Sequence, residues 1–269
     1  MEFLILSSFD HQRSWQFEYG STFYNSCYFM AHHCQLLGCD VGAKLRQKLL
    51  VHDKADGENT TPMSTDSIIT YIDFVPRLRQ MASEAIRCHL DQRCDDIKQL
   101  IPSGQLFTNL SERERIVNCE KAIRGCMMML QQLNDVWKEV LTPYVRLRAL
   151  SCLVTSYLST IFNAVSSLDD IAADDANIMA DIIGRNLIDV EKLFVLDDQP
   201  SHPRFINQAH SRTRELVGML NGSLMEINDR WCDGAGPLAH AVPPDAVKRL
   251  IRALFQNTQK RADILSKIR

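Results

Sequence analysis

The sequence of 269 residues lacks the short motifs that identify most enzymes. Its 11 glycines do not gather into a loop that would cradle a phosphate, and no nucleophile elbow or paired-carboxylate constellation is present. No charge of one sign dominates, because 30 Lys and Arg residues face 33 Asp and Glu residues, and no broad basic footprint for nucleic acid is visible. We therefore expect no catalytic residues, no cofactor and no direct contact with nucleic acid.

Long hydrophobic runs are also missing near the start of the chain. The longest early run, Phe3 to Leu6, is far too short for a membrane span or for the core of a signal peptide, and acidic Glu2 precedes it. Because 45% of the residues are hydrophobic, the chain is nevertheless able to bury a real core. We expect a soluble, cytoplasmic protein.

The nine cysteines do not form the even, closely spaced framework of a small secreted domain. They are scattered along the chain: Cys27, Cys34, Cys39, Cys88, Cys94, Cys119, Cys126, Cys152 and Cys232. Structural zinc usually takes two separated pairs of ligands, and neither His32 and His33 beside Cys34 nor His89 near two cysteines supplies them. We expect reduced thiols and no metal.

Apolar residues recur every three or four positions, whereas strand alternation, internal repeats and low-complexity segments are absent after residue 20. The recurrence predicts about seven long amphipathic helices, near residues 21–38, 68–97, 111–140, 143–168, 173–196, 206–231 and 247–268. Isolated helices of this kind are not stable, so they must pack together. We predict an all-α fold, an elongated antiparallel helical bundle or rod.

We expect three parts within this rod, which spans residues 21–269, after a poorly defined segment at residues 1–20. Residues 21–110 form the first helical part, residues 111–203 the middle helices and residues 204–269 a C-terminal hairpin.

Local signals set the ends of the first helices. The helix that ends at Gly38 is predicted to bury one stripe: Phe23, Cys27, Met30, Cys34 and Leu37. In the next helix Ile72 belongs to the apolar face, and Pro76 predicts a kink because it lacks a backbone N–H.

Two helix starts in the middle of the chain carry capping signals. Ser111 and Glu114 have the spacing of a capping box. Thr142 and Pro143 fit the N-cap and the first helical position of the next helix.

The tail is organised around one turn between two helical patterns: Asp233, Gly234, Gly236 and Pro237. After it, one apolar face is predicted: Val247, Leu250, Ile251, Leu254, Ala262, Leu265 and Ile268. Trp231, just before the turn, is expected to plug the space between the last two helices, with contact to a partner as the second interpretation. The same ambiguity applies to Arg230.

The polar side of the last helix is basic: Lys248, Arg249, Arg252, Lys260, Arg261, Lys267 and Arg269. Ordinary solvation and the helix dipole account for such residues, and an acidic partner surface is the functional alternative. The candidate partner-binding residues are therefore Arg230, Trp231, Arg249, Arg252 and Lys260.

Four aspartates supply the case for an enzyme: Asp169, Asp170, Asp174 and Asp175. All-helical isoprenoid synthases hold magnesium between two acidic clusters on facing helices. Here a second cluster is missing, because Asn134, Asp135 and Glu139 have the wrong spacing, and acidic residues before a helix also complement its dipole. A Mg-dependent enzyme of isoprenoid-synthase type remains the alternative function.

Several segments resemble the Zeste-white ten kinetochore and membrane-tethering family. The tail carries EI-DRW-DG-GPLA from Glu226, followed by LIRALFQNT-RA-L-KI from Leu250. Near the start, Phe23 to Gly38 (FYNSCYFMAHHCQLLG) is similar to the segment that opens the family's C-terminal region. The resemblance covers about Thr22 to Arg269 and is densest at the tail.

The resemblance implies a non-catalytic helical rod of the tethering-complex (CATCHR-like) type that works in two assemblies. At kinetochores in mitosis, family members join Rough deal and Zwilch, supporting the spindle checkpoint of cell division and recruitment of dynein and dynactin. At the cytoplasmic face of the endoplasmic reticulum in interphase, they join a tethering complex with neuroblastoma-amplified protein that captures Golgi-derived vesicles. Association with the membrane is peripheral, through the complex.

In that family the C-terminal rod docks on the large helical solenoid partner, Rough deal or neuroblastoma-amplified protein, while an N-terminal coiled-coil segment makes the other contacts. No such segment matches in this sequence. We therefore expect this chain to be the partner-docking C-terminal rod, as a fragment or a truncated gene product.

Overall fold

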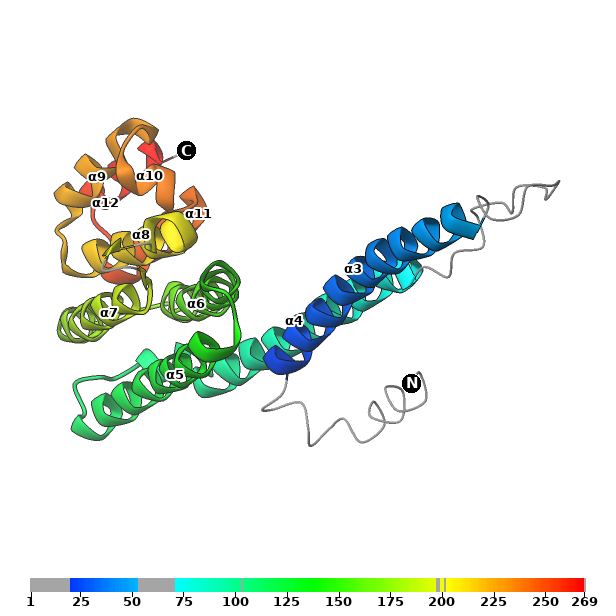
Figure 1. The fold of residues 1–269 in the computed structure, drawn as a ribbon. Helices are drawn as coiled ribbons and strands as arrows, with labels where there is room; N and C mark the ends of the chain where they lie inside the picture. The colour runs from blue at the N-terminus through cyan, green and yellow to red at the C-terminus, as the bar shows by residue number, and fades with distance from the viewer. Residues whose placement is uncertain (1–19, 53–70, 103, 197–198, 201, 269) are drawn as a thin grey trace. The chain divides into compact units, whose positions relative to one another are not determined.

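The computed structural model describes residues 20–52, 71–102, 104–196, 199–200 and 202–268. Almost all of them lie in helices, which confirms the all-α prediction (Figure 1). The predicted N-terminal segment 1–20 lies outside this range except for Gly20. The chain is divided into two compact units, Met1–Asp91 and Gln92–Arg269.

The first unit contains α3 (Gly20–His52), the 3-10 turn η2 (Tyr71–Asp73) and most of α4 (Phe74–Leu100). Figure 1 shows α3 and α4 side by side. Ala31 packs with Val75 and Leu78 in a small core, and Arg79 Nη2 donates a hydrogen bond of 3.2 Å to Gln35 Oε1. The two helices therefore form a hairpin with one narrow seam.

Several predictions for this hairpin differ from the structure, because the seam is narrow and the second helix starts at Phe74. Helix α3 continues beyond Gly38, and of its predicted stripe Met30 and Leu37 are 37% and 48% exposed. Ile72 precedes α4 and is also exposed. Pro76 lies in the first turn of α4, where a missing N–H removes no helical hydrogen bond, so no kink is needed there.

In the second unit, α5 (Arg113–Val140), α6 (Pro143–Ser166), α7 (Ala173–Leu193) and α8 (His202–Asn221) pack against one another (Figure 1). Helix α6 supplies the centre of this core. Its predicted apolar positions are all buried: Leu147, Leu150, Val154, Tyr157, Ile161 and Val165. Tyr157 Oη donates a hydrogen bond of 3.0 Å to Asn186 Oδ1 on α7, and burial raises the pKa of Tyr157 well above its usual value.

Helix α6 is the one helix within the described residues that is long and apolar enough to cross a membrane by length and composition. Because 61% of its most apolar window is buried by other helices, it also fits the core helix of a packed bundle. Thr142 is its N-cap and Pro143 its first residue, as predicted.

The predicted capping box at Ser111 was wrong. Helix α5 begins at Arg113 with Glu112 as its N-cap, after a 3-10 turn, η3 (Gly104–Phe107). Ser111 instead donates from its backbone N and its Oγ to Asp175 Oδ1, at 2.8 Å each, so the hydroxyl ties this loop to the start of α7.

The break after α7 contains a small antiparallel pair, β1 (Val195–Leu196) and β2 (Gln199–Pro200). Helix α8 then bends at Ile206, whose φ of −128° and ψ of 16° are not helical. The pattern predicted as one helix from residue 206 to 231 is divided at Gly222, where an added Cβ would lie 2.6 Å from the Gly218 carbonyl oxygen.

Candidate functional site

The last quarter of the chain folds into short helices rather than the predicted pair of long ones. They are α9 (Leu224–Trp231), the 3-10 turn η4 (Cys232–Gly234), α10 (Pro237–Ala241), α11 (Pro244–Leu254) and α12 (Gln259–Lys267). These segments lie together next to α8 in Figure 1.

Helix α9 starts with a capping box that the sequence reading missed. Ser223 N donates to Glu226 Oε2 at 2.6 Å, and Glu226 N donates to Ser223 Oγ at 3.3 Å. The Ser-x-x-Glu spacing in the sequence was the available signal. These hydrogen bonds from Ser223 hold the pKa of Glu226 below its ordinary value.

The turn after α9 depends on backbone conformations that favour glycine. Cys232, Asp233 and Gly234 have φ values of 47°, 49° and 93°, in the left-handed region. Gly236 N donates to the Trp231 carbonyl oxygen at 3.0 Å, and an added Cβ at Gly236 would collide with backbone atoms of Arg230. Pro237 then opens α10 at its first position.

Trp231 fills the space inside this turn. Its side chain is only 2% exposed, and its buried Nε1 has no hydrogen-bond partner among the described residues. A plug explains this position, whereas direct contact of the ring with a partner would require the turn to open.

Arg230 is held by this chain's own carboxylate. Its Nε and Nη2 donate to Glu215 Oε2 and Oε1 at 2.9 Å and 2.6 Å. Glu215 is 5% exposed on α8, and the hydrogen bonds that Arg230 donates to this carboxylate raise the pKa of Arg230. The pair therefore fastens α9 to α8, and a role for Arg230 in partner binding stays a prediction.

Helix α11 is built into the core of the second unit. Its inner face is buried at Ala246, Val247, Leu250, Ile251 and Ala253. The Ala253 carbonyl oxygen accepts a hydrogen bond of 3.0 Å from Ile171 N, which joins the end of α11 to the segment before α7.

The single helix predicted from residue 247 to 268 ends at Leu254, because Phe255 is extended. Thr258 Oγ1 then accepts from Arg261 N at 3.3 Å and starts α12. The break shifts the helical phase, so Ile264 is buried and Ala262, predicted as part of the dry face, is exposed.

Three of the five candidate partner-binding residues lie on the surface of α11 and α12. Arg249, Arg252 and Lys260 are exposed, and none of them forms an ion pair with another described residue. Arg261, next to Lys260, donates from Nη1 to the carbonyl oxygens of Phe255 and Arg252 at 2.6 Å and 3.2 Å. This contact fastens the start of α12 to the end of α11.

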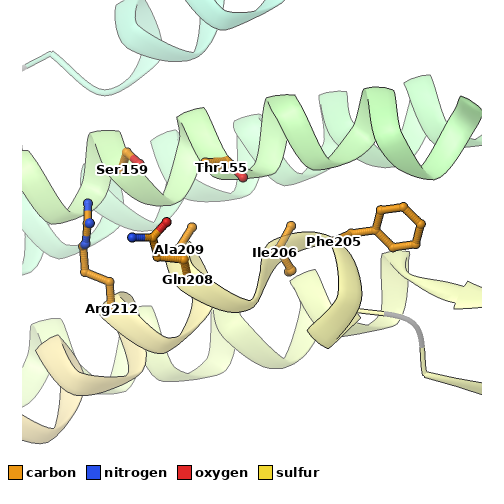
Figure 2. A pocket seen from close by; sticks show the side chains of 7 residues that line it. All are labelled: Thr155, Ser159, Phe205, Ile206, Gln208, Ala209 and Arg212. Atoms are coloured by element: carbon orange, nitrogen blue, oxygen red, sulfur yellow. The ribbon is translucent and has the colours of Figure 1, made fainter. Parts of the chain in front are cut away.

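A small pocket lies between α6 and α8 beside the bend at Ile206, with a volume of about 160 Å³ (Figure 2). Its lining residues are Thr155, Ser159, Phe205, Ile206, Gln208, Ala209 and Arg212. Pockets for drug-sized ligands usually hold about 300 to 1,000 Å³, so this one is small. Arg212 is also used internally, since its Nε donates to the Ala241 carbonyl oxygen at 3.3 Å and its guanidinium lies 5.5 Å from the Phe162 ring centre.

The aspartates of the alternative enzyme function do not meet a second acidic cluster in the described structure. Asp169, Asp170 and Asp174 are exposed around the start of α7, and Asp175 accepts from Ser111. Asn134 is buried and its Oδ1 accepts from Arg146 Nη1 at 2.7 Å. Among the described residues, no three His, Cys, Asp or Glu side chains gather as a metal site would require.

The eight cysteines whose side chains are described are free thiols. Burial raises the pKa of both Cys119 and Cys126 to about 12, which keeps them protonated at neutral pH. Cys34 lies partly buried on α3 beside the exposed His32 and His33, without a group of three metal ligands within the described part.

This arrangement defines a class of protein: an all-α bundle whose short C-terminal helices complete the core and leave basic side chains on its surface. Residues 121–268 match the ZW10 C-terminal helical domain. The chain belongs to the ZW10 family, which the resemblance in the sequence had indicated.

Relatives from animals and plants match over much of the chain. The rat "Centromere/kinetochore protein zw10 homolog" is 29% identical over 253 residues, which are 91% of this chain and 31% of that protein. The Drosophila melanogaster "Centromere/kinetochore protein zw10" is 35% identical over 150 residues, 55% of this chain and 20% of that protein. An Arabidopsis thaliana homologue is 24% identical over 211 residues. The chain thus spans about a third or less of the length of these relatives.

Proposed function

We propose that this chain is a non-catalytic subunit of a kinetochore complex that acts in chromosome segregation during mitosis. The match of residues 121–268 to the ZW10 C-terminal helical domain carries the proposal, supported by relatives whose names place them at centromeres and kinetochores. In this proposal the chain localises to the kinetochore and spindle in mitosis. There it works with Rough deal and Zwilch, supporting the spindle checkpoint and the recruitment of dynein and dynactin.

The second part of the proposal is a role in a tethering complex at the cytoplasmic face of the endoplasmic reticulum in interphase. There the chain joins neuroblastoma-amplified protein in the transport of Golgi-derived vesicles, as a rod of CATCHR-like type with peripheral membrane association. The resemblance to the Zeste-white ten family supports this part.

Docking on a large helical solenoid subunit is the shared step of both roles. The C-terminal region is proposed to make this contact, because the family resemblance is densest there and Arg249, Arg252 and Lys260 on α11 and α12 are exposed. Deletion of residues 222–269 would be a poor test, since it removes the buried face of α11 from the core. The binding experiment therefore uses the intact chain.

Co-purification tests the proposal. The tagged intact chain is mixed with purified Rough deal solenoid subunit, and separately with neuroblastoma-amplified protein, followed by size-exclusion chromatography. We expect co-elution with both subunits and, in dividing cells, enrichment of a fluorescent version at kinetochores. Failure to co-elute with either subunit at micromolar concentration would contradict the docking function.

A further inference from the structure

Several cations on the earlier helices form ion pairs with carboxylates of this chain. Examples are Lys98 with Asp95 at 2.9 Å on α4 and Lys192 with Asp189 at 2.8 Å on α7. Arg230 with Glu215 is the last such pair along the described residues. From Pro244 to Ile268, six Lys and Arg residues face two Asp residues, and none of the described side chains there forms an ion pair.

Four of these cations form what we call the basic surface: Lys248, Arg249, Arg252 and Lys260. The first three follow one another at helical spacing on α11, on the side away from the buried Val247 and Leu250. Lys260 precedes Arg261, whose hydrogen bonds to the Arg252 and Phe255 carbonyl oxygens join the start of α12 to the end of α11.

Helix electrostatics account for only part of this arrangement. Arg252 lies in the last turn of α11, where the helix dipole favours a cation. Lys248 and Arg249 lie in the middle of α11, and Lys260 lies in the first turn of α12, where the dipole disfavours a cation. A partner with negative charge would remove this unfavourable concentration of cations.

We propose that the basic surface docks an acidic helical face, rich in Asp and Glu, of the solenoid partner. This inference rests on the proposed function and adds to it the chemistry of the contact. The planar guanidinium groups of Arg249 and Arg252 suit carboxylates because each can donate two parallel hydrogen bonds. Complementary charge of this kind acts mainly on the rate of association and on specificity.

An anionic membrane is the other partner that a basic surface attracts, and the structure disfavours it. Membrane-bound amphipathic helices insert an apolar face, whereas the apolar face of α11 is buried in this protein. Beyond Met225, no described residue is an exposed large hydrophobic side chain that would serve as an anchor.

Charge reversal tests the inference on the intact chain. The variant Arg249→Glu, Arg252→Glu, Lys260→Glu is compared with a matched control on α5, Arg113→Glu, Lys121→Glu, Arg124→Glu, whose three cations are also exposed. Binding kinetics are measured against the purified Rough deal solenoid subunit at two salt concentrations. We expect association of the first variant to slow roughly 10- to 100-fold with a weaker salt dependence, and the control to stay within about twofold.

A conservative variant and a vesicle assay complete the test. Arg249→Lys with Arg252→Lys keeps the charge, so the salt dependence should persist while complex dissociation becomes faster. The unaltered chain should not bind vesicles of phosphatidylserine and phosphatidylcholine more than neutral vesicles. Loss of vesicle binding in the reversal variant, with binding to the subunit intact, would overturn the inference in favour of a membrane.

The two levels of the proposal fail in different ways. If the unaltered chain does not bind the solenoid subunit, the docking function fails and the inference falls with it. If the unaltered chain binds and the reversal variant binds equally well, the proposed role of the basic surface is contradicted, while the docking function stands.

Discussion

At the residue level, Trp231 is the largest of the buried apolar side chains in the C-terminal helices. The ring is 2% exposed, so Trp231→Ala removes a large apolar group and leaves a cavity beneath the turn. We expect the free energy of unfolding to fall by about 3 to 5 kcal/mol. Chemical denaturation measures the change, with Met225→Ala as a control because Met225 is 61% exposed. Equal stability of the two variants would mean that the ring is not a plug.

Arg230 is expected to contribute to the stability of the fold, whereas Arg249 is expected to be a surface cation with little effect on stability. Arg230→Ala leaves the Glu215 carboxylate unpaired at 5% exposure, so we expect a loss of about 2 kcal/mol in unfolding free energy. Arg249→Ala removes a solvated cation, and its effect on stability should stay within about 0.5 kcal/mol. Thermal melting compares both variants. A larger loss for Arg249→Ala would contradict these assignments.

At the level of the helix, the capping box of α9 predicts that the stability of the protein depends on pH. The pKa of Glu226 lies below its ordinary 4.5 in the folded protein because Ser223 donates to the carboxylate. The ionised Glu226 therefore stabilises the fold at pH values above the pKa of the unfolded state. This stabilisation is lost as the pH falls through the lower pKa of Glu226 in the folded protein. Between about pH 6 and about pH 3, the melting temperature of the Glu226→Gln variant should fall less than that of the unaltered chain. Parallel melting curves would contradict the capping box.

The cap itself has a separate test. Ser223→Ala removes the acceptor for Glu226 N and should lower the free energy of unfolding by about 1 kcal/mol at neutral pH. The control is Ser111→Ala, whose hydroxyl donates to Asp175 and caps no helix. In a chain that also carries Glu226→Gln, the loss of unfolding free energy from Ser111→Ala should be unchanged. The loss from Ser223→Ala should be smaller in that background.

The sequence predicts an element correctly where the spacing of its apolar residues matches the side of the helix that is buried. Helix α6 is the clearest case, because it packs in the centre of a core and every predicted apolar position is buried. Helix α12 shows the opposite case, because the break after Leu254 shifts the phase and only the N-cap at Thr258 marks the new start.

Tertiary contacts explain the remaining errors. Ser111 prefers Asp175, 64 residues further along the chain, to a local cap, and no local pattern reports such a partner. The exposed positions of Arg249 and Arg252 could be predicted from the sequence because α11 has separate polar and apolar sides. The internal pairing of Arg230 with Glu215 could not be predicted, because it depends on how α9 returns to α8.

The whole molecule is an all-α chain of the ZW10 family whose C-terminal helices contribute to both the core and the surface. Their inner faces complete the second unit, and their outer faces are proposed to contact the solenoid subunit. Stability and the proposed docking therefore depend on different residues of the same helices.

Hydrogen–deuterium exchange of the intact chain, with and without the purified solenoid subunit, shows which helices contact that subunit. We expect slower amide exchange on binding in residues 244–268, and a smaller change in α5, which carries the control cations. Protection confined to α5 or to the first unit, with unchanged exchange in residues 244–268, would contradict this expectation.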